Sequence, residues 1–445
     1  MRNILLYIII LIGFIKVDAQ TATLTLQQCR EMALENSEDM KIATFQNENA
    51  TLQKGVARSA YFPKIDASAT YAYFNADMEM DMSGTELTIP LPPEMGGMMI
   101  DVSDMIPESI PMKFKTDMFM VGATLQQPIY AGGKIIAGNK MANTGIEITE
   151  QYAQLTRMEV VAEVEKAYWN YYLIEDKIEL LKQYEALLDS LQQTITDMIS
   201  VEMATEGELL KISSRTSNIK YQMQKAINGK ELLRMQLCRI VGLDLNSDII
   251  LTDTLSINSF SGGVADLSSR PEYIMMQKQV ELKEQEIKSV RGDYLPMIGA
   301  MAGYTYLGDI DNIKMNKPIP MVMASINIPI FHFGEGHKKV KSAKIARDIK
   351  QEEFNKNKKL LEIEVQYAER NLQDVFLLVA TAEIGLEQAK DNLERSQNSY
   401  EMGMGTLLDV LDAQTQWQEA YSNLVEAKIE SKFKEIDYLK ATGNL

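Results

Sequence analysis

The sequence predicts a mainly α-helical protein with a membrane β-barrel, built from a duplicated helix-strand-strand-helix-helix unit. Three observations predict this fold class. Short sequence blocks recur in both halves of the chain, two long segments lack proline and keep a heptad pattern, and four segments alternate apolar and polar residues. Long coiled-coil helices and amphipathic strands are therefore expected in one chain.

The first residues have the features of a secretory signal peptide. Arg2 precedes an apolar run over residues 4–15, and Val17-Asp18-Ala19 has the small residues that signal peptidase prefers. We expect residues 1–19 to be removed. The apolar run is shorter than the roughly 20 residues that cross a bilayer as a helix, and no later stretch is longer. Any membrane insertion must therefore use strands.

The composition argues against nucleic acid as a partner. The formal net charge is −17, whereas phosphate binding needs a clustered positive surface. No nucleophile with its base, phosphate-cradling loop or zinc spacing occurs in the sequence. We therefore expect no enzymatic activity, no cofactor and no metal site.

Two cysteines, Cys29 and Cys238, would meet an oxidising compartment after export. A disulfide between them and two separate buried thiols are both consistent with the sequence.

The first recurring block predicts two strands. Residues 58–63 recur as residues 291–296, and apolar residues then alternate with polar or small ones, which predicts strands over about 62–74 and 295–306. Both strands carry tyrosines at equivalent alternate positions: Tyr71, Tyr73, Tyr304 and Tyr306. Amphipathic rings favour the membrane boundary, and packing inside a barrel is the alternative.

The second recurring block predicts a second strand in each half, over about 117–127 and 320–329. Proline removes a ladder donor and glycine frees the backbone, so the residues after these strands are interpreted as strand-to-helix transitions. The transition residues are Pro128, Gly132, Gly133, Pro329 and Gly334.

Residues 75–115 lie between two predicted strands and are expected to form an outer loop. The loop contains Met78, Met80, Met82, Met98 and Met99, and clustered thioethers can hold copper(I). Methionine is abundant throughout the chain, however, and the loop has no histidine or cysteine, so a metal role is not favoured. At the second transition, His332 and His337 are interpreted as interfacial side chains.

Long helices are expected at about 134–200, 207–240, 337–400 and 406–440. In the third of these, apolar residues follow alternating steps of four and three from Leu361 to Tyr400, the spacing of a left-handed coiled coil. The first helix follows the same rule with one slip before Tyr184. At about 1.5 Å per residue, each of the two longer helices would be roughly 100 Å long.

The repeats divide the mature chain into a first structural repeat, 20–262, and a second, 263–445. A third block matches Gly207-Glu208-Leu209-Leu210 with Gly405-Thr406-Leu407-Leu408, which sets Lys211 opposite Asp409. Because single-chain outer-membrane barrels start at eight strands, four strands require a barrel shared between copies of the chain.

The order of these motifs resembles that of the TolC-like outer-membrane efflux protein family. The resemblance covers essentially the whole mature chain, and its most specific part is the stretch from Tyr400 through residues 405–413. It implies a homotrimer with a 12-stranded β-barrel in the cell outer membrane, continued by a long α-helical coiled-coil barrel in the periplasm. It also implies docking of a periplasmic adaptor (membrane fusion protein) and an inner-membrane pump.

The same resemblance points to a periplasmic gate at Asp409, Asp412 and Tyr400. The two aspartates share a helix face, and around a three-fold axis they would form stacked carboxylate rings. The alternative is that Asp409 only caps its helix with Thr406. Tyr400 is either an inter-helix contact at the closed tip or the last residue of the coiled-coil seam.

The expected function is therefore an outer-membrane export duct for multidrug efflux or type I secretion, a passive conduit opened by its partners. Two alternatives remain at this stage. A periplasmic adaptor or scaffold would share the heptads but would not need two pairs of amphipathic strands. A partner-independent porin would have no use for helices of this length.

Overall fold

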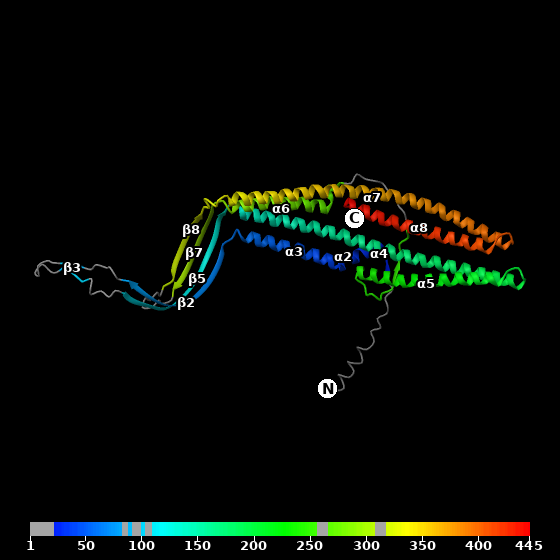
Figure 1. Ribbon diagram of the computed structural model, residues 1–445, viewed down its shortest axis with the longest axis horizontal. Coiled ribbons are helices and arrows are strands. Elements are labelled where there is room, and N and C mark those ends of the chain that lie inside the picture. The colour runs from blue at the N-terminus through cyan, green and yellow to red at the C-terminus, as the bar shows by residue number, and fades with distance from the viewer. Residues whose placement is uncertain (1–21, 82–87, 91–98, 103–108, 256–265, 308–316) are drawn as a thin grey trace, which may run out of the picture. The chain divides into compact units, whose positions relative to one another are not determined.

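The computed structural model describes residues 22–81, 88–90, 99–102, 109–255, 266–307 and 317–445 (Figure 1). These residues form two compact units. The first contains the described parts of Met1–Gln53, Ala142–Lys283 and Ile345–Leu445, and the second those of Lys54–Met141 and Glu284–Lys344. Each unit takes segments from both halves of the sequence, so the compact units do not coincide with the two sequence repeats. The expected signal peptide lies outside the described residues.

The first unit is helical. Two helices of 67 residues dominate the chain, and each is followed by a helix of 36 residues. The helices, some of which continue into the second unit, are α2 (Leu26–Asn36), α3 (Glu38–Ser59), α4 (Lys134–Ser200), α5 (Glu206–Val241), α6 (Pro271–Gly292), α7 (Glu335–Glu401) and α8 (Leu407–Thr442). A 3-10 turn, η3 (Leu267–Ser269), precedes α6.

Helices α4, α5, α7 and α8 lie side by side in the first unit (Figure 1). The seam predicted for the second half is buried along α7 at Val365, Ala368, Leu372, Val375, Val379, Leu393 and Tyr400. Ion pairs mark the neighbours: Lys230 of α5 with Glu175 of α4, Lys166 of α4 with Asp437 of α8, and Lys428 of α8 with Glu383 of α7. Helix α4 therefore contacts both α5 and α8. Since these pairs are partly exposed, the buried apolar seams contribute most of the stability.

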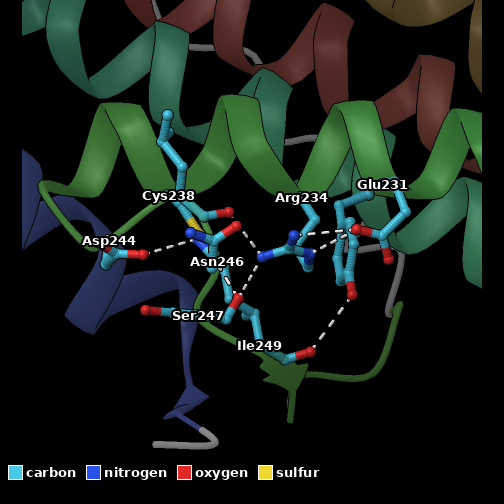
Figure 2. A network of polar contacts seen from close by, with 9 residues as sticks. Glu231, Arg234, Cys238, Asp244, Asn246, Ser247 and Ile249 are labelled. Atoms are coloured by element: carbon cyan, nitrogen blue, oxygen red, sulfur yellow. Dashed lines mark hydrogen bonds and ion pairs between the residues drawn. The ribbon is translucent and has the colours of Figure 1, made fainter. Parts of the chain in front are cut away.

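A polar network anchors the loop that follows α5 (Figure 2). Arg234 is 7% exposed and pairs with Glu231 on the same helix. Its guanidinium also donates to the main-chain oxygens of Leu245 at 2.9 Å and Ser247 at 2.5 Å. The loop leads into β6 (Ile249–Leu251), which pairs in parallel with β1 (Ala22–Leu24). A buried cation with several acceptors thus fixes the loop between α5 and β6, the strand that pairs with the start of the described chain.

The second unit contains a four-stranded antiparallel sheet in the order β2-β5-β7-β8 (Figure 1). Its strands are β2 (Lys64–Asp81), β5 (Ser109–Ala131), β7 (Met297–Leu307) and β8 (Ile319–Asn327). A short pair, β3 (Thr88–Pro90) and β4 (Met99–Asp101), lies between β2 and β5 in the sequence. Strands β2 and β8 form the edges, and each has one neighbour in the sheet.

The register gives the sheet two different faces. Ala302 of β7 lies opposite Leu125 of β5 and Val322 of β8, and such apolar residues line one face. On the other face, Gly303 lies opposite Thr124 and Met321. Because side chains alternate along every strand, one face is apolar along β7, β8, Ile65–Tyr73 of β2 and Phe119–Leu125 of β5, and the other is small or polar with some methionines. Farther along the β2–β5 pair the pattern reverses, with Asp77 opposite Lys113 and Ala76 opposite Phe114.

Strands β2 and β5 are longer than the sequence indicates, so both ends of the expected outer loop 75–115 belong to these strands. After Tyr73 the apolar residues of β2 move to the other set of alternate positions, through Met80, and those of β5 do the same from Ile110, with acidic residues and Pro111 between them. The pairing of β5 with β7 stops at Met120, so the first part of β5 pairs only with β2. Proline is tolerated there because this part of β5 has only one neighbouring strand.

Equivalent helices of the two halves have equal lengths, and the spacing between them changes only across the strands. Glu38 and Pro271, which begin α3 and α6, are 233 positions apart. The first residues of α4 and α7 are 201 apart, as are those of α5 and α8. The first half therefore has 32 more residues between its helices, all of them in the hairpin of β2 and β5.

Candidate functional site

The candidate site is the pair of turns that reverse the chain between α4 and α5 and between α7 and α8, which we call the tip turns (residues 201–205 and 402–406). In the second turn, the N–H groups of Met404 and Gly405 donate to the carbonyl of Ser399 at 2.9 and 3.0 Å. In the first turn, the N–H of Met203 donates to Met198 at 2.8 Å. Each turn needs a residue with positive φ. Gly403 supplies it with a φ of 72°, and Glu202 supplies it with a φ of 63°, where its Cβ causes strain.

Asp409 caps helix α8. Its carboxylate accepts hydrogen bonds from the main-chain N–H of Thr406 at 2.9 Å and from the Thr406 hydroxyl at 2.7 Å. The Asp409 N–H donates back to the Thr406 hydroxyl oxygen at 3.3 Å. This reciprocal pair is a capping box, and its hydrogen bonds lower the pKa of Asp409. The carboxylate is exposed and stays ionised well below neutral pH.

Asp412 lies one helical turn beyond Asp409 on the exposed surface of α8. Residues three apart share a helix face, so the two carboxylates form one acidic strip at the start of α8.

The matched helix starts correct the alignment of the third sequence block. Thr205 caps α5 with Glu208 in the same reciprocal box that Thr406 and Asp409 form on α8. With equivalent positions 201 apart, Glu208 is the counterpart of Asp409, and Lys211 is the counterpart of Asp412. The Gly-x-Leu-Leu match misleads because leucines recur at several helix positions, whereas the capping threonine and its acidic partner fix the helix start.

The tip turns share one apolar core. Leu191 and Ile195 of α4, Ile212 of α5, Tyr400 of α7, and Leu407 and Val410 of α8 are all buried in it. Tyr400 is 7% exposed, and burial, with a smaller effect of the Glu208 carboxylate, raises its pKa. Tyr400 is therefore both the last seam residue and a contact between the two helix pairs at the tip.

Arg215 of α5 links the two helix pairs about one helical turn beyond this core. Its guanidinium donates to the Tyr184 hydroxyl of α4 at 3.2 Å and to the Thr415 hydroxyl of α8. A hollow of about 280 Å³ opens beside it between α5 and α8, lined mainly by polar side chains including Gln222, Gln418 and Glu419. Sequence reasoning missed Arg215. The available signal was a cation three residues after Ile212 and four before Ile219, on the packed side of α5.

The sequence profile of the family described as "Outer membrane efflux protein" matches residues 29–197 and 265–444, well over half of the chain. The chain belongs to the outer membrane efflux protein family.

Relatives of this family member are distant in sequence but similar over most of their length. The probable efflux pump outer membrane protein TtgC of Pseudomonas putida is 20% identical over 436 residues, covering 94% of this chain and 82% of that protein. The outer membrane protein TolC of Vibrio cholerae is 20% identical over 351 residues, covering 74% and 78%. The crystal structure of the Campylobacter jejuni CmeC outer membrane channel superposes with a TM-score of 0.75 at 19% identity, covering 94% of this chain and 85% of that one.

In this efflux-family chain, the transition residues form tight connections at the ends of β5 and β8. The ladder between β5 and β7 is irregular between Pro128 and Tyr130. Gly132 has a φ of 61°, and a Cβ there would collide with the carbonyl of Gly292. Glycine is therefore required at this first connection on two grounds. Gly133 and Gly334 also have positive φ, and Pro329 follows the end of β8.

The four tyrosines Tyr71, Tyr73, Tyr304 and Tyr306 lie on the apolar face of the sheet. Tyr304 and Tyr306 lie opposite Ala123 and Val121, which continue that face. All four are exposed, and none is enclosed by the sheet.

The two cysteines are free thiols in one apolar core. Cys29 of α2 and Cys238 of α5 are both fully buried there, and the Cys238 thiol donates to the Ser247 carbonyl at 3.7 Å (Figure 2). The disulfide is therefore not formed in this structure. Burial raises the pKa of Cys29 to about 12, which leaves that thiol protonated and poorly reactive.

The two histidines and the methionine-rich loop lie near the strands in the sequence. His332 and His337 are exposed beside the second transition, where the His332 ring lies 6.1 Å from that of Tyr294. Of the methionine-rich loop, Met82 and Met98 fall outside the described residues. In the part of the chain that the structure describes, no helix combines the length and apolar character needed to cross a membrane.

Proposed function

We propose that the chain is the outer-membrane duct of an efflux or type I secretion assembly. In this proposal it is a passive conduit, closed at the tip turns and opened when a periplasmic adaptor and an inner-membrane pump dock. The observation that carries the proposal is the four-stranded sheet, whose faces differ and whose two edge strands are open.

The difference between the faces fits a wall between lipid and water. Along β7, β8 and the parts of β2 and β5 nearest the helices, the apolar face carries alanine, valine, leucine and isoleucine together with the four tyrosines. The opposite face carries glycine, serine, threonine, glutamine, Lys64 and Asp66, with several methionines. Strands that separate lipid from an aqueous lumen need this alternation. The tyrosines would then form an aromatic belt at the outer boundary.

The open edges support a homotrimer. In lipid an unpaired strand edge leaves donors and acceptors unsatisfied, so β2 of one copy should pair with β8 of the next. Four strands per copy then give twelve in a closed barrel. Exposed apolar residues on the helices, such as Phe45 of α3 and Tyr367 and Leu377 of α7, support the same conclusion, because they would be buried between copies.

The tip turns supply the gate in this proposal. Asp409 and Asp412 of three copies would form two rings of carboxylates in a narrow passage, which favours cations and disfavours anions. Asp409 keeps its capping role in this arrangement, since its carboxylate is exposed while it caps α8. Tyr400 and the core around it hold the helix pairs together in the closed state.

The test is single-channel conductance of the purified protein in planar bilayers. The parent is compared with Asp409→Ala/Asp412→Ala and with a matched control, Asp391→Ala/Glu394→Ala, which removes two exposed carboxylates of the same spacing from α7. We expect a small, cation-selective conductance in the parent that rises or loses selectivity only in the tip variant.

Two other outcomes contradict parts of the proposal. A large conductance that neither variant changes would exclude the carboxylate gate and favour a partner-independent porin. Absence of any channel would favour a periplasmic scaffold.

A further inference from the structure

The helix ends that flank the sheet are strongly basic, although the chain as a whole carries a formal charge of −17. Four segments, residues 54–64, 132–141, 284–296 and 328–344, contain eleven lysines and arginines against four aspartates and glutamates. The strand register brings all four to the same end of the sheet, because Lys64 pairs with Gln126 and Met297 pairs with Asn327 and Ala131. A local excess of this size requires its own explanation.

The start of α7 contains the most lysines of these segments, and Lys338, Lys339, Lys341 and Lys344 are all exposed. Lys339 pairs with Glu335 at 2.7 Å. Within the described residues, the other three lysines have no carboxylate partner. Cations in the first turns also oppose the helix dipole, so they do not stabilise the helix.

The first half shows that helix formation here does not require lysines at three of these four positions. The positions equivalent to Lys338, Lys339 and Lys344, 201 residues earlier, are Ala137, Gly138 and Asn143, and α4 forms there equally well. Lys341 corresponds to Lys140 of α4, so Lys338, Lys339 and Lys344, but not Lys341, are specific to the second half and point to a role outside the helix.

An apolar surface directly precedes these lysines. Ile330 is 90% exposed, Phe331 71% and Phe333 87%, and the two phenylalanine rings lie 4.7 Å apart. Ile328 and Ile330 follow Val322, Ala324 and Ile326 at alternate sequence positions, directly after β8 ends at Asn327.

Phe333 has a strained backbone conformation. Its φ is 46°, a left-handed conformation for which the first half uses Gly132 at 61°. A bulky residue in this region costs on the order of 1 kcal/mol or more, and such strain persists mainly where a side chain has a function.

We propose that Ile330, Phe331 and Phe333, together with Lys338, Lys341 and Lys344, form a binding surface for anionic phospholipid, and we call it the strand-exit patch. The aromatic side enters the acyl region while the lysines contact the phosphate groups. The inference rests on the proposed function in one respect, that the sheet enters the outer membrane and α7 leaves it on the periplasmic side. The leaflet on that side consists of phospholipids.

The test measures which lipids stay with the full-length protein. Protein is equilibrated with mixed vesicles of phosphatidylethanolamine and phosphatidylglycerol, purified in mild detergent, and its retained lipids are quantified by mass spectrometry. The parent is compared with Lys338→Gln/Lys341→Gln/Lys344→Gln. The matched control is Lys356→Gln/Lys358→Gln/Lys359→Gln, which removes three exposed lysines from the same helix.

We expect the parent and the control to be enriched in phosphatidylglycerol and the patch variant to lose the enrichment. Since each lysine near an anionic surface changes binding about fivefold, the preference should fall on the order of 100-fold at low salt. Phe333→Gly, with all lysines intact, should lower the retention of phosphatidylglycerol several-fold. Soluble glycerol phosphate at equal concentration should not displace the lipid.

Equal retention of phosphatidylglycerol by the patch variant and the control would overturn the proposal. This is the result expected if the lysines bind an acidic protein partner instead of lipid. Displacement by glycerol phosphate would show a free-anion site instead. Conductance in bilayers of phosphatidylethanolamine alone separates this inference from the duct. If the patch variant conducts normally but has lost the preference for phosphatidylglycerol, both proposals are supported. If the parent retains the lipid through its lysines but never conducts, only the proposed duct function is contradicted.

Discussion

Asp409 combines two properties that substitutions can separate, its capping hydrogen bonds and its charge. Thr406→Ala removes the cap and keeps the charge, and it should lower stability by about 1 kcal/mol per copy without changing ion selectivity. Asp409→Asn keeps an acceptor for the cap and removes the charge, so it should reduce cation selectivity with a smaller loss of stability. Thermal unfolding and reversal potentials measured on both variants check this division. A selectivity change in Thr406→Ala would argue that helix order, and not charge, controls the passage.

The capping hydrogen bonds also predict an acid sensitivity. The folded-state pKa of Asp409 lies below its unfolded value of about 3.9. The stabilisation is therefore present above that value and is lost as the pH falls through the lowered pKa. A series of thermal unfolding midpoints taken from about pH 5 downwards should show a smaller acid-induced decrease for Asp409→Asn than for the parent. Parallel curves for the two proteins would contradict this account.

Glu202 is strained in a way that its counterpart is not. It has a φ of 63° in the first tip turn, where the second turn uses Gly403 at 72°. Glu202→Gly should raise stability by about 0.5–1 kcal/mol, because the left-handed conformation is unfavourable for a residue with a Cβ. The control is Glu206→Gly in the first turn of α5, which should be neutral or destabilising. Equal shifts in the thermal midpoint for both variants would show that the loss of charge, and not backbone strain, is responsible.

Among the elements, the pairs α4/α5 and α7/α8 can separate at the tip only if the links between them break. Arg215 is one such link, because its guanidinium joins Tyr184 of α4 to Thr415 of α8. Arg215→Gln should make the closed state less favourable and raise the frequency of open events in bilayers several-fold. Arg395→Gln on α7 is the control, since Arg395 is exposed. An unchanged open frequency in Arg215→Gln would mean that the apolar core around Tyr400 alone holds the tip closed.

The elements also show how far the sequence alone can lead. The seam of α7 is predictable because a heptad pattern is local and each buried position, such as Leu372 or Val379, adds to it. The far ends of β2 and β5 are not, because acidic residues and Pro111 interrupt the pattern at places where only one neighbouring strand is present. Arg215 escapes prediction for another reason. Its partners lie 31 and 200 residues away, and no local pattern announces such a contact.

For the whole molecule, the two faces of the sheet make a prediction about insertion. Ala324 and Ser325 are neighbours on β8 whose side chains point to opposite faces. Ala324→Arg places a charge on the face assigned to lipid, where it costs about 2–4 kcal/mol at mid-membrane, and should sharply reduce the amount of protein in the outer membrane. Ser325→Arg should be tolerated and should shift selectivity towards anions. Membrane fractionation and conductance measure the two effects, and equal loss of both variants would contradict the assignment of the faces.

The equal helix lengths in the two halves have a consequence for how such a chain can change. One residue inserted into α4 would turn everything after it by about 100° around the helix axis and carry the buried seam away from its partners. Helices of 67 and 36 residues are thus preserved in both halves, while 32 additional residues are accommodated in a single hairpin. New length can enter this protein where strands end in a loop, and almost nowhere along its helices.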